Sequence, residues 1–178
     1  MIKPQLTTVL EASHHDPVYD VYWLTGGKAG KECVSTSTDG RVLWWDMRKT
    51  DKPTDDVKLG AKDPGKPVEC HTLDHNFGTE ENKNIKILGG TSMEYNTDAG
   101  PQKFLIGTEQ GYIMSVMKRK TIETQFKFGT NQGKHHGPVY ALERNPFHLK
   151  YFMSVGDWQA KMWCEEGVFN PIMQTRYH

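Results

Sequence analysis

The chain has 178 residues, enough for one domain with a sizeable core, and its 22 basic and 22 acidic residues leave no net charge. This balance gives no electrostatic reason to expect a nucleic acid or an anionic membrane as a partner. Three widely spaced cysteines do not suggest a disulfide framework, no apolar signal segment opens the chain, and no run approaches the roughly 18 apolar residues of a membrane span. We therefore expect a soluble intracellular protein.

The first repeat unit is predicted over residues 14–59, and it opens with His-His-Asp-Pro-Val-Tyr at His14–Tyr19. Asp39-Gly40 separates two apolar runs, which indicates a tight hairpin, because glycine tolerates a positive φ and Asp bonds to its own backbone. The run Val42–Trp45 does not alternate polar with apolar residues, as is typical of a strand buried on both faces. The predicted strands are Val18–Leu24, Glu32–Ser37, Val42–Asp46 and Asp56–Leu59.

Residues 60–84 interrupt this pattern. They are rich in Lys, Asp, Pro, Gly and Asn and contain few apolar residues. Such a composition predicts a mobile insertion on the surface.

A weaker copy of the unit is predicted over residues 85–130, with Gln110-Gly111 as a poorer version of the Asp-Gly turn. Counting along the chain puts Glu109 in the place of Asp39, and Ser115 in the place of Trp45. The predicted strands are Thr91–Tyr95, Lys103–Thr108, Tyr112–Met117 and Glu123–Phe128.

The third copy, over residues 131–178, repeats the first most closely. It opens with His-His-Gly-Pro-Val-Tyr at His135–Tyr140, and Asp157 precedes Trp163 by six positions, as Asp39 precedes Trp45. The predicted strands are Val139–Arg144, Tyr151–Val155, Ala160–Trp163 and Ile172–Arg176.

These three copies predict an all-β protein: a partial WD40 β-propeller of about three four-stranded blades. Residues 1–13 are interpreted as a linker and the outermost strand of a preceding blade, with that strand at Gln5–Leu10. Three blades cannot close a ring, because propellers have at least about four. The chain is therefore either a fragment or a short form that completes its ring on a partner.

Several motifs resemble the WD repeats of outer-arm axonemal dynein intermediate chains. They are Ser-Thr-Asp-Gly-x-Val-x-Trp-Trp-Asp at 37–46, Gly-Thr-Glu-Gln-Gly at 107–111 and Val-Gly-Asp-Trp-x-Ala-x-x-Trp at 155–163. The general WD signature is shared by many proteins, whereas the Gly-Asp-Trp and Gly-Thr-Glu-Gln-Gly versions are much narrower. The resemblance extends from about Leu10 to His178, apart from residues 60–84.

The resemblance implies a closed propeller of about seven blades in a longer protein. It also implies a non-catalytic scaffold without a cofactor, located in the axoneme of cilia and flagella. Its implied partners are the dynein heavy-chain tail, a second intermediate chain and, through regions outside this chain, light chains. Two other functions remain: an adaptor of cytoplasmic or intraflagellar-transport dynein, and a small hydrolase that uses His and Asp.

His15, Ser37, Asp39 and Trp45 are the first candidate site, since they suggest the Ser, His and Asp of a hydrolase triad. No Gly-x-Ser-x-Gly nucleophile elbow occurs. The resemblance implies instead a structural hydrogen-bond chain from Trp through Ser and His to Asp. We therefore expect no catalytic residues.

The third copy contains His136, Asp157 and Trp163 at three of these positions. Val155 takes the place of the Ser, so the second chain is predicted to be incomplete. A catalytic set would not be expected twice in one chain.

No metal site is expected, although Cys70, His71 and His75 lie close together and His residues are paired at 14–15 and 135–136. Zinc needs about four converging ligands, and no Cys-x2-Cys pair occurs.

Trp158 and Phe147 are candidate contacts for a protein partner, because exposed aromatic residues often anchor interfaces. Trp158 follows the turn residue Asp157, so it either projects from the rim or packs across its own turn. For Phe147, which follows Asn145-Pro146, a cover over its own hairpin is favoured.

Overall fold

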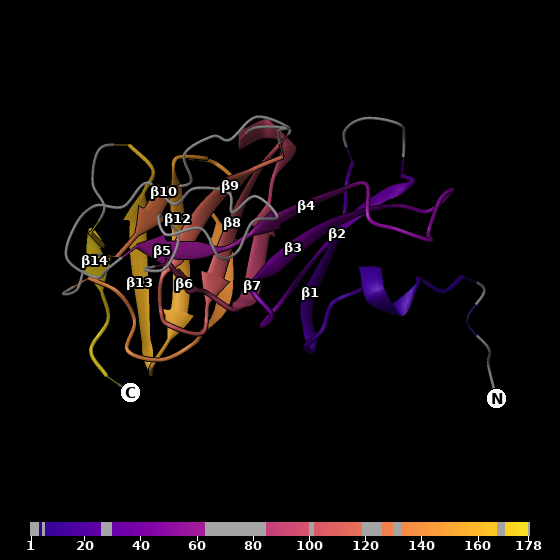
Figure 1. Cartoon of the computed structure of the whole chain (residues 1–178). Coiled ribbons are helices and arrows are strands. Elements are labelled where there is room, and N and C mark those ends of the chain that lie inside the picture. The colour runs from indigo at the N-terminus through magenta and orange to yellow at the C-terminus, as the bar shows by residue number, and fades with distance from the viewer. Residues whose placement is uncertain are drawn as a thin grey trace.

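The computed structural model describes residues 4, 6–25, 30–62, 85–99, 102–118, 126–129, 133–166 and 170–177. Three antiparallel four-stranded sheets dominate it, and they follow one another along the chain without closing into a ring (Figure 1). The helical segments among the described residues are the 3-10 turns Leu10–Ala12 and Thr97–Ala99. None of these described helices is long and apolar enough to cross a membrane. The prediction of an all-β fold is confirmed.

Each sheet is a meander whose strands pair in chain order. The first contains β1 (Val18–Trp23), β2 (Glu32–Ser37), β3 (Arg41–Asp46) and β4 (Asp55–Lys58). The second contains β7 (Gly90–Tyr95), β8 (Lys103–Thr108), β9 (Ile113–Met117) and β10 (Phe126–Phe128). The third contains β11 (Val139–Arg144), β12 (Tyr151–Gly156), β13 (Gln159–Cys164) and β14 (Met173–Gln174). All twelve strands lie where the sequence predicts them, with small differences at their ends.

Two predictions outside these sheets need correction. The strand predicted at Gln5–Leu10 is absent from the part that the structure describes: residues 6–9 are irregular and Leu10 begins a 3-10 turn. A strand needs a neighbour to satisfy its backbone groups, and none of the described sheets pairs with this segment. The first three residues of the predicted insertion form a strand, since β5 (Gly60–Lys62) pairs with β6 (Ile85–Ile87), which follows the insertion. Residues 63–84, and their predicted mobility, lie outside the described residues.

The register shows which positions of the three sheets are equivalent. The first strand of each sheet (β1, β7 and β11) has the same one-residue irregularity in its pairing, at Tyr19, Thr91 and Tyr140. The pairs Thr36–Val42 and Gly107–Ile113 enclose loops of equal length, so Gln110 corresponds to Asp39 and Val116 to Trp45. The assignments of Glu109 and Ser115 to these places were therefore wrong by one residue, because counting along the chain ignores where the turn begins.

Each sheet has two sides, called face A and face B. Face A carries Trp45, Val116 or Trp163, and face B carries the preceding residue in each sheet, which is Trp44, Ser115 or Met162. This definition holds because successive side chains of a strand point to opposite sides.

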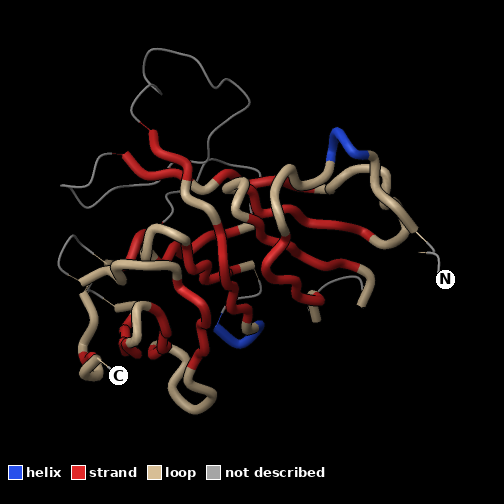
Figure 2. The backbone as a smooth tube through the Cα atoms, turned by 90° about the horizontal axis from the view of Figure 1, so that it is seen from below, coloured by secondary structure: helices blue, strands red, loops and turns tan. Residues whose placement is uncertain are grey.

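The sheets stack with face B of one against face A of the next. At the first interface the rings of Trp44 and Phe104 meet edge to face, 5.5 Å apart. At the second, Leu105 and Ile113 pack with Phe152 and Trp163. The first and third sheets thus lie on opposite sides of the second, as the strand labels of Figure 1 show; Figure 2 gives the same backbone turned by 90°. Val42–Trp45 and Phe104–Ile106 are buried throughout, as their apolar runs predict.

Candidate functional site: two hydrogen-bond tetrads and an aromatic rim

Four side chains of the first sheet form a continuous hydrogen-bond tetrad. His14, in the loop before β1, contacts the carboxylate of the turn residue Asp39 through Nδ1 at 3.0 Å. Its Nε2 lies 2.8 Å from Oγ of Ser35 on β2, and the same hydroxyl accepts the indole N–H of Trp45 on β3 at 2.8 Å. Pairing of Cys33 with Trp45 places Ser35 and Trp45 on the same face, face A, within reach of each other.

The third sheet contains a second tetrad with the same connections. His135 contacts Asp157 through Nδ1 at 2.5 Å and Ser154 through Nε2 at 2.7 Å. Trp163 donates its indole N–H to Ser154 at 2.8 Å. The interaction therefore occurs twice, at equivalent places on β2 and β12.

The chemistry of the donors sets the direction of each tetrad. An ionised carboxylate can only accept, so the His donates to the Asp from Nδ1. When the ring is neutral, its Nε2 carries no proton and accepts the Ser hydroxyl, which in turn accepts the indole N–H. Each tetrad therefore runs in one direction, from Trp through Ser and His to Asp.

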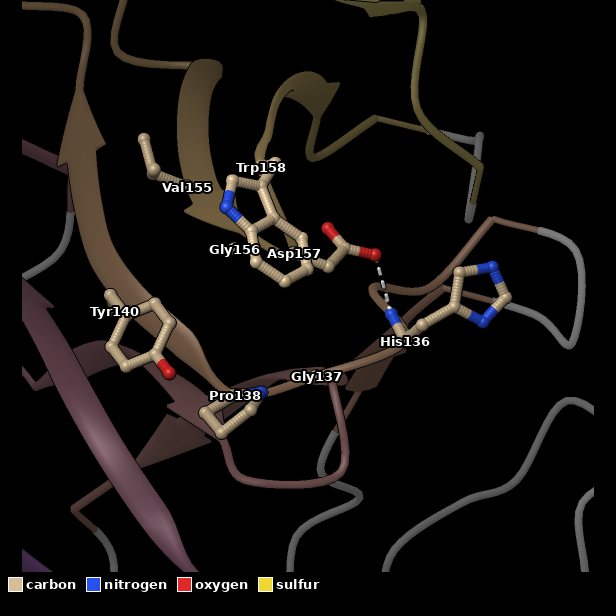
Figure 3. A pocket seen from close by; sticks show the side chains of 8 residues that line it. All are labelled: His136, Gly137, Pro138, Tyr140, Val155, Gly156, Asp157 and Trp158. Atoms are coloured by element: carbon tan, nitrogen blue, oxygen red, sulfur yellow. Dashed lines mark hydrogen bonds between the residues drawn. The ribbon is translucent and has the colours of Figure 1, made fainter. Parts of the chain in front are cut away.

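The structure corrects the predicted membership of both tetrads. His14 and His135 supply the rings, whereas His15 and His136 donate their backbone N–H groups to the Asp carboxylates, at 3.0 and 2.7 Å. The second of these bonds is the dashed line in Figure 3. In each His-His pair, then, the first residue turns its ring inward and the second caps the Asp through its backbone.

The Ser position was also misassigned in both sheets. Ser35 takes the place predicted for Ser37, whose hydroxyl donates instead to the carbonyl of Asp16 at 3.0 Å. Ser154 takes the place predicted for Val155, so the second tetrad is complete. The pairing of each Trp strand with its neighbouring strand identifies both Ser residues, whereas a fixed number of residues before the turn Asp does not.

The tetrads are buried, and their pKa values reflect it. Burial raises the pKa of Asp39, but the hydrogen bonds from His14 and from the backbone N–H groups of His15 and Arg41 outweigh it, so this pKa lies below its ordinary value. The pKa of Asp157 is lowered in the same way: burial opposes ionisation, and the bonds from His136 and His135 outweigh it.

The ring of His135 behaves differently from the two carboxyls. Burial lowers the pKa of His135 by more than the bond to Asp157 raises it. At neutral pH the ring is therefore neutral beside a charged carboxylate, as the direction of the tetrad requires.

Both tetrads have the bonding order of a Ser-His-Asp hydrolase triad, but not its accessibility. Ser35 and Ser154 are only 4% and 0% exposed, and each hydroxyl already accepts an indole N–H. A nucleophile must reach its substrate, and these hydroxyls lie beneath packed strands. The arrangement is suited to satisfying polar groups buried between sheets.

The second sheet shows what replaces a tetrad. Ile106 and Val116 occupy the positions of Ser35 and Trp45, and both are fully buried. An apolar pair needs no hydrogen-bond partner, so packing replaces the tetrad at these two positions.

A hollow of about 540 Å³ opens beside the second tetrad, where the rings of Tyr140 and Trp158 lie around it with Pro138 and Val155 (Figure 3). Trp158 is 77% exposed, so it does not pack across its own turn. Asp157 and Trp158 have φ values of 41° and 59°, a conformation uncommon for any residue except glycine. This two-residue turn holds the indole outward.

Phe147 lies in the loop between β11 and β12 and is 89% exposed, so the predicted cover over its own hairpin is wrong. The side-chain oxygen of Asn145 accepts the backbone N–H groups of Phe147 and His148, at 2.9 and 3.0 Å. The phenyl ring therefore projects from a turn of defined shape.

No cluster of three or more metal-ligating side chains occurs among the residues that the structure describes. Cys70, His71 and His75 lie outside them.

Stacked four-stranded meanders joined by repeated Trp-Ser-His-Asp tetrads define the class of this protein, a partial WD40 β-propeller. The chain is 41% identical over 177 residues to the 70 kDa intermediate chain of the flagellar outer-arm dynein of Chlamydomonas reinhardtii, covering 98% of this chain and 27% of that protein. It is 41% identical over 174 residues to dynein axonemal intermediate chain 2 of Homo sapiens, covering 98% and 25%. It is 45% identical over 169 residues to ciliary dynein intermediate chain 3 of Heliocidaris crassispina, covering 95% and 25%.

The chain is thus similar over nearly its whole length to axonemal dynein intermediate chains, and the resemblance inferred from its motifs is confirmed. It spans about a quarter of the length of these relatives. No protein-family model matches it.

Proposed function

We propose that this chain acts within an outer-arm axonemal dynein as part of a non-catalytic scaffold subunit that supports ciliary or flagellar movement. The observation that carries the proposal is the similarity of nearly the whole chain to outer-arm and axonemal intermediate chains. The relatives named above favour this assignment over an adaptor of cytoplasmic or intraflagellar-transport dynein.

The two tetrads support a scaffold rather than a hydrolase. Their hydroxyls are buried, and their protons are committed to a chain that ends at a carboxylate. Fully satisfied buried networks make a fold rigid, which is what a docking surface requires. The proposed mechanism is therefore geometric: stiff blades present loops to other subunits.

Trp158 and Phe147 are the proposed contacts with those subunits. Both rings are largely exposed, and both are held by defined turns, so little conformational freedom is lost when they bind. The proposed partners are the dynein heavy-chain tail and a second intermediate chain, with light chains bound by other regions of the longer relatives. Burial of the aromatic rings would supply affinity, and nearby charges would set the register.

Capture from ciliary extract tests this proposal. The tagged full chain should recover a dynein heavy chain, identified by immunoblot. The double variant Trp158→Ser/Phe147→Ser should recover at least about tenfold less, as expected for two interface anchors. Tyr177→Ser, which removes another exposed aromatic ring, is the matched control and should not change recovery. A folded wild-type chain that recovers no heavy chain would contradict the proposal.

A further inference from the structure

The loop between β11 and β12 is a turn that hydrogen bonds hold at both ends. The side-chain oxygen of Asn145 accepts the backbone N–H groups of Phe147 and His148. The backbone N–H of Asn145 donates to the carbonyl of Tyr151, and the backbone N–H of Tyr151 donates to the carbonyl of His148, each at 2.9 Å. The guanidinium of the buried Arg144 also donates to a carbonyl of this loop. The turn therefore has a defined shape before any partner binds.

The second sheet has the same turn with a different residue at its tip. By the register of β7 and β11, Asn96 corresponds to Asn145, and Asp98 therefore corresponds to Phe147. The side-chain oxygen of Asn96 accepts the backbone N–H of Asp98 at 2.8 Å. Asp98 is exposed although the second sheet lies between the other two. Exposure at the tip of this turn is therefore a property of the turn and does not depend on a neighbouring sheet.

Phe147 gives this tip an apolar ring where the equivalent turn has a carboxylate. The ring is 89% exposed, so it adds little packing to the fold. The carboxylate of Asp98 is well hydrated in water, whereas an apolar ring gains free energy when a partner removes it from water. A ring that projects this far is fully buried only by a concave pocket.

The charges beside the turn balance each other. Lys150, at the end of the loop, pairs with Glu166 after β13 at 2.7 Å, and both side chains are largely exposed. This ion pair adds no net charge beside the ring of Phe147. Contact through the ring should therefore depend only weakly on salt, unlike a contact guided by charge.

Phe147 and Trp158 lie at opposite ends of β12, because Phe147 precedes the strand and Trp158 follows it. This strand has six residues and spans roughly 20 Å. A pocket that takes one aromatic ring cannot reach both residues. The contact made by Phe147 is thus separate from any contact made by Trp158.

We propose that the turn at 145–148 is a preformed plug, and that the ring of Phe147 enters an apolar pocket, one aromatic ring deep, on the dynein heavy chain. The partner comes from the proposed function, on which this inference rests, and the chemistry of the pocket comes from the turn. Asn145 is a positioning residue: its side chain holds the turn in shape, so less conformational freedom is lost on binding.

Binding of the full chain to heavy chains purified from ciliary outer arms and freed of their own intermediate chains tests the plug, measured by biolayer interferometry. Phe147→Ala should weaken binding at least about tenfold, because it removes the ring. The loss should change by less than about twofold between about 0.1 and about 0.5 M NaCl. Asp98→Ala, at the tip of the equivalent turn, is the matched control and should leave the affinity unchanged.

The role of Asn145 has its own test in the same assay. Asn145→Ala keeps the ring of Phe147 but removes the acceptor, and it should weaken binding about threefold. Asn145→Asp keeps an accepting oxygen and should bind like wild type. Asn96→Ala removes the equivalent acceptor from the second sheet and should have no effect on binding. Circular dichroism of each variant confirms that it is folded.

The outcomes separate the plug from the proposed function. Wild-type binding that falls with Phe147→Ala and not with Asp98→Ala supports the plug. Wild-type binding that a folded Phe147→Ala variant retains overturns the plug, while the scaffold function stands with the heavy chain docked elsewhere. A folded wild type that does not bind contradicts both. Equal losses for Asn145→Ala and Asn96→Ala would reflect general loosening and overturn the positioning role.

Discussion

At the scale of single residues, the tetrads show which parts of the site the sequence determines. Asp39, Asp157, Trp45 and Trp163 could be placed because each Asp-to-Trp spacing repeats and reflects the hairpin geometry. The choice between adjacent His residues could not be made, since it depends on the direction in which the preceding loop turns. In the first sheet the Ser was missed because Ser35 and Ser37 share one face, and only the pairing shows which is level with the indole. In the third sheet Ser154 and Val155 are adjacent and point to opposite faces, so the pairing was again needed to choose between them.

Ser35→Ala should lower the free energy of unfolding by about 3 kcal/mol, measured by urea denaturation. The substitution leaves the indole N–H of Trp45 and Nε2 of His14 buried without their partner. Ser37→Ala, which removes one bond to a backbone carbonyl, should cost only about 1 kcal/mol. Equal costs, or a larger cost for Ser37→Ala, would show that the tetrad is wrongly assigned.

Acidification should destabilise the protein in two steps. The first begins below pH 6.5, because the unfolded chain protonates His135 at its ordinary pKa, whereas burial lowers the pKa of His135 in the folded state. The second step lies below pH 3.8. In this range Asp39 and Asp157 take up protons in the unfolded chain, whereas their pKa values are lower in the folded protein. Both shifts make stability fall as pH falls, and denaturation curves between pH 7 and 3 measure it.

His135→Gln is the control for the first step, since it removes the titrating ring. The variant should lose the decline that begins below pH 6.5 and keep the part of the decline below pH 3.8 that comes from Asp39, while the part from Asp157 shrinks because His135 helps to lower its pKa. A wild-type protein that becomes more stable between pH 7 and 5 would reverse the sign and refute this account.

At the scale of elements, strand positions were predictable from apolar runs and turn residues, whereas turn lengths were less so. The loop at Asp39 has one residue more than the turn at Asp157, so no single offset from the Asp places the Ser in both sheets. The segment at Leu6–Leu10 has the composition of an outer strand, but it pairs with no described sheet, and pairing rather than composition makes a strand.

Trp158→Gly should raise the free energy of unfolding by about 1 kcal/mol, because glycine relieves the positive φ at this turn. The same change should weaken recovery of the heavy chain. Gly40→Ala is a control with the opposite sign, since its φ is +76° and an added Cβ would meet the side chain of Ile87. If Trp158→Gly destabilises the protein, the indole contributes to folding and the proposed role as an exposed anchor loses its support.

At the scale of the whole molecule, the stacked sheets are joined by charge as well as by apolar packing. Arg144 of β11 is buried and donates to both carboxylate oxygens of Glu94 on β7, at 3.0 Å, and to Glu165 after β13, at 3.2 Å. Lys103 of β8 in turn bridges Glu165 at 2.9 Å. Lys118, after β9, makes a similar bridge to Glu32 of the first sheet at 3.2 Å. No sequence pattern predicted these links, because they join strands of different repeats.

Arg144→Leu should lower the free energy of unfolding by about 3–5 kcal/mol, because it leaves the Glu94 carboxylate buried without its partner. The pKa of Glu94 is already raised by burial. The double variant Arg144→Leu/Glu94→Leu should recover part of this loss in thermal denaturation, since it removes the unpaired charge as well. A double variant less stable than Arg144→Leu alone would argue against this link between sheets.

The most direct test of the central claim, that the sheets stack face B on face A, is a set of nuclear Overhauser contacts between aromatic rings of the full chain in solution. The account predicts cross-peaks between Trp44 and Phe104 across the first interface, and between Phe128 and Phe152 across the second, since these ring centres are 5.5 and 5.2 Å apart. Absence of both contacts in the folded protein, or contacts from Trp45 to Phe104 in place of those from Trp44, would contradict it.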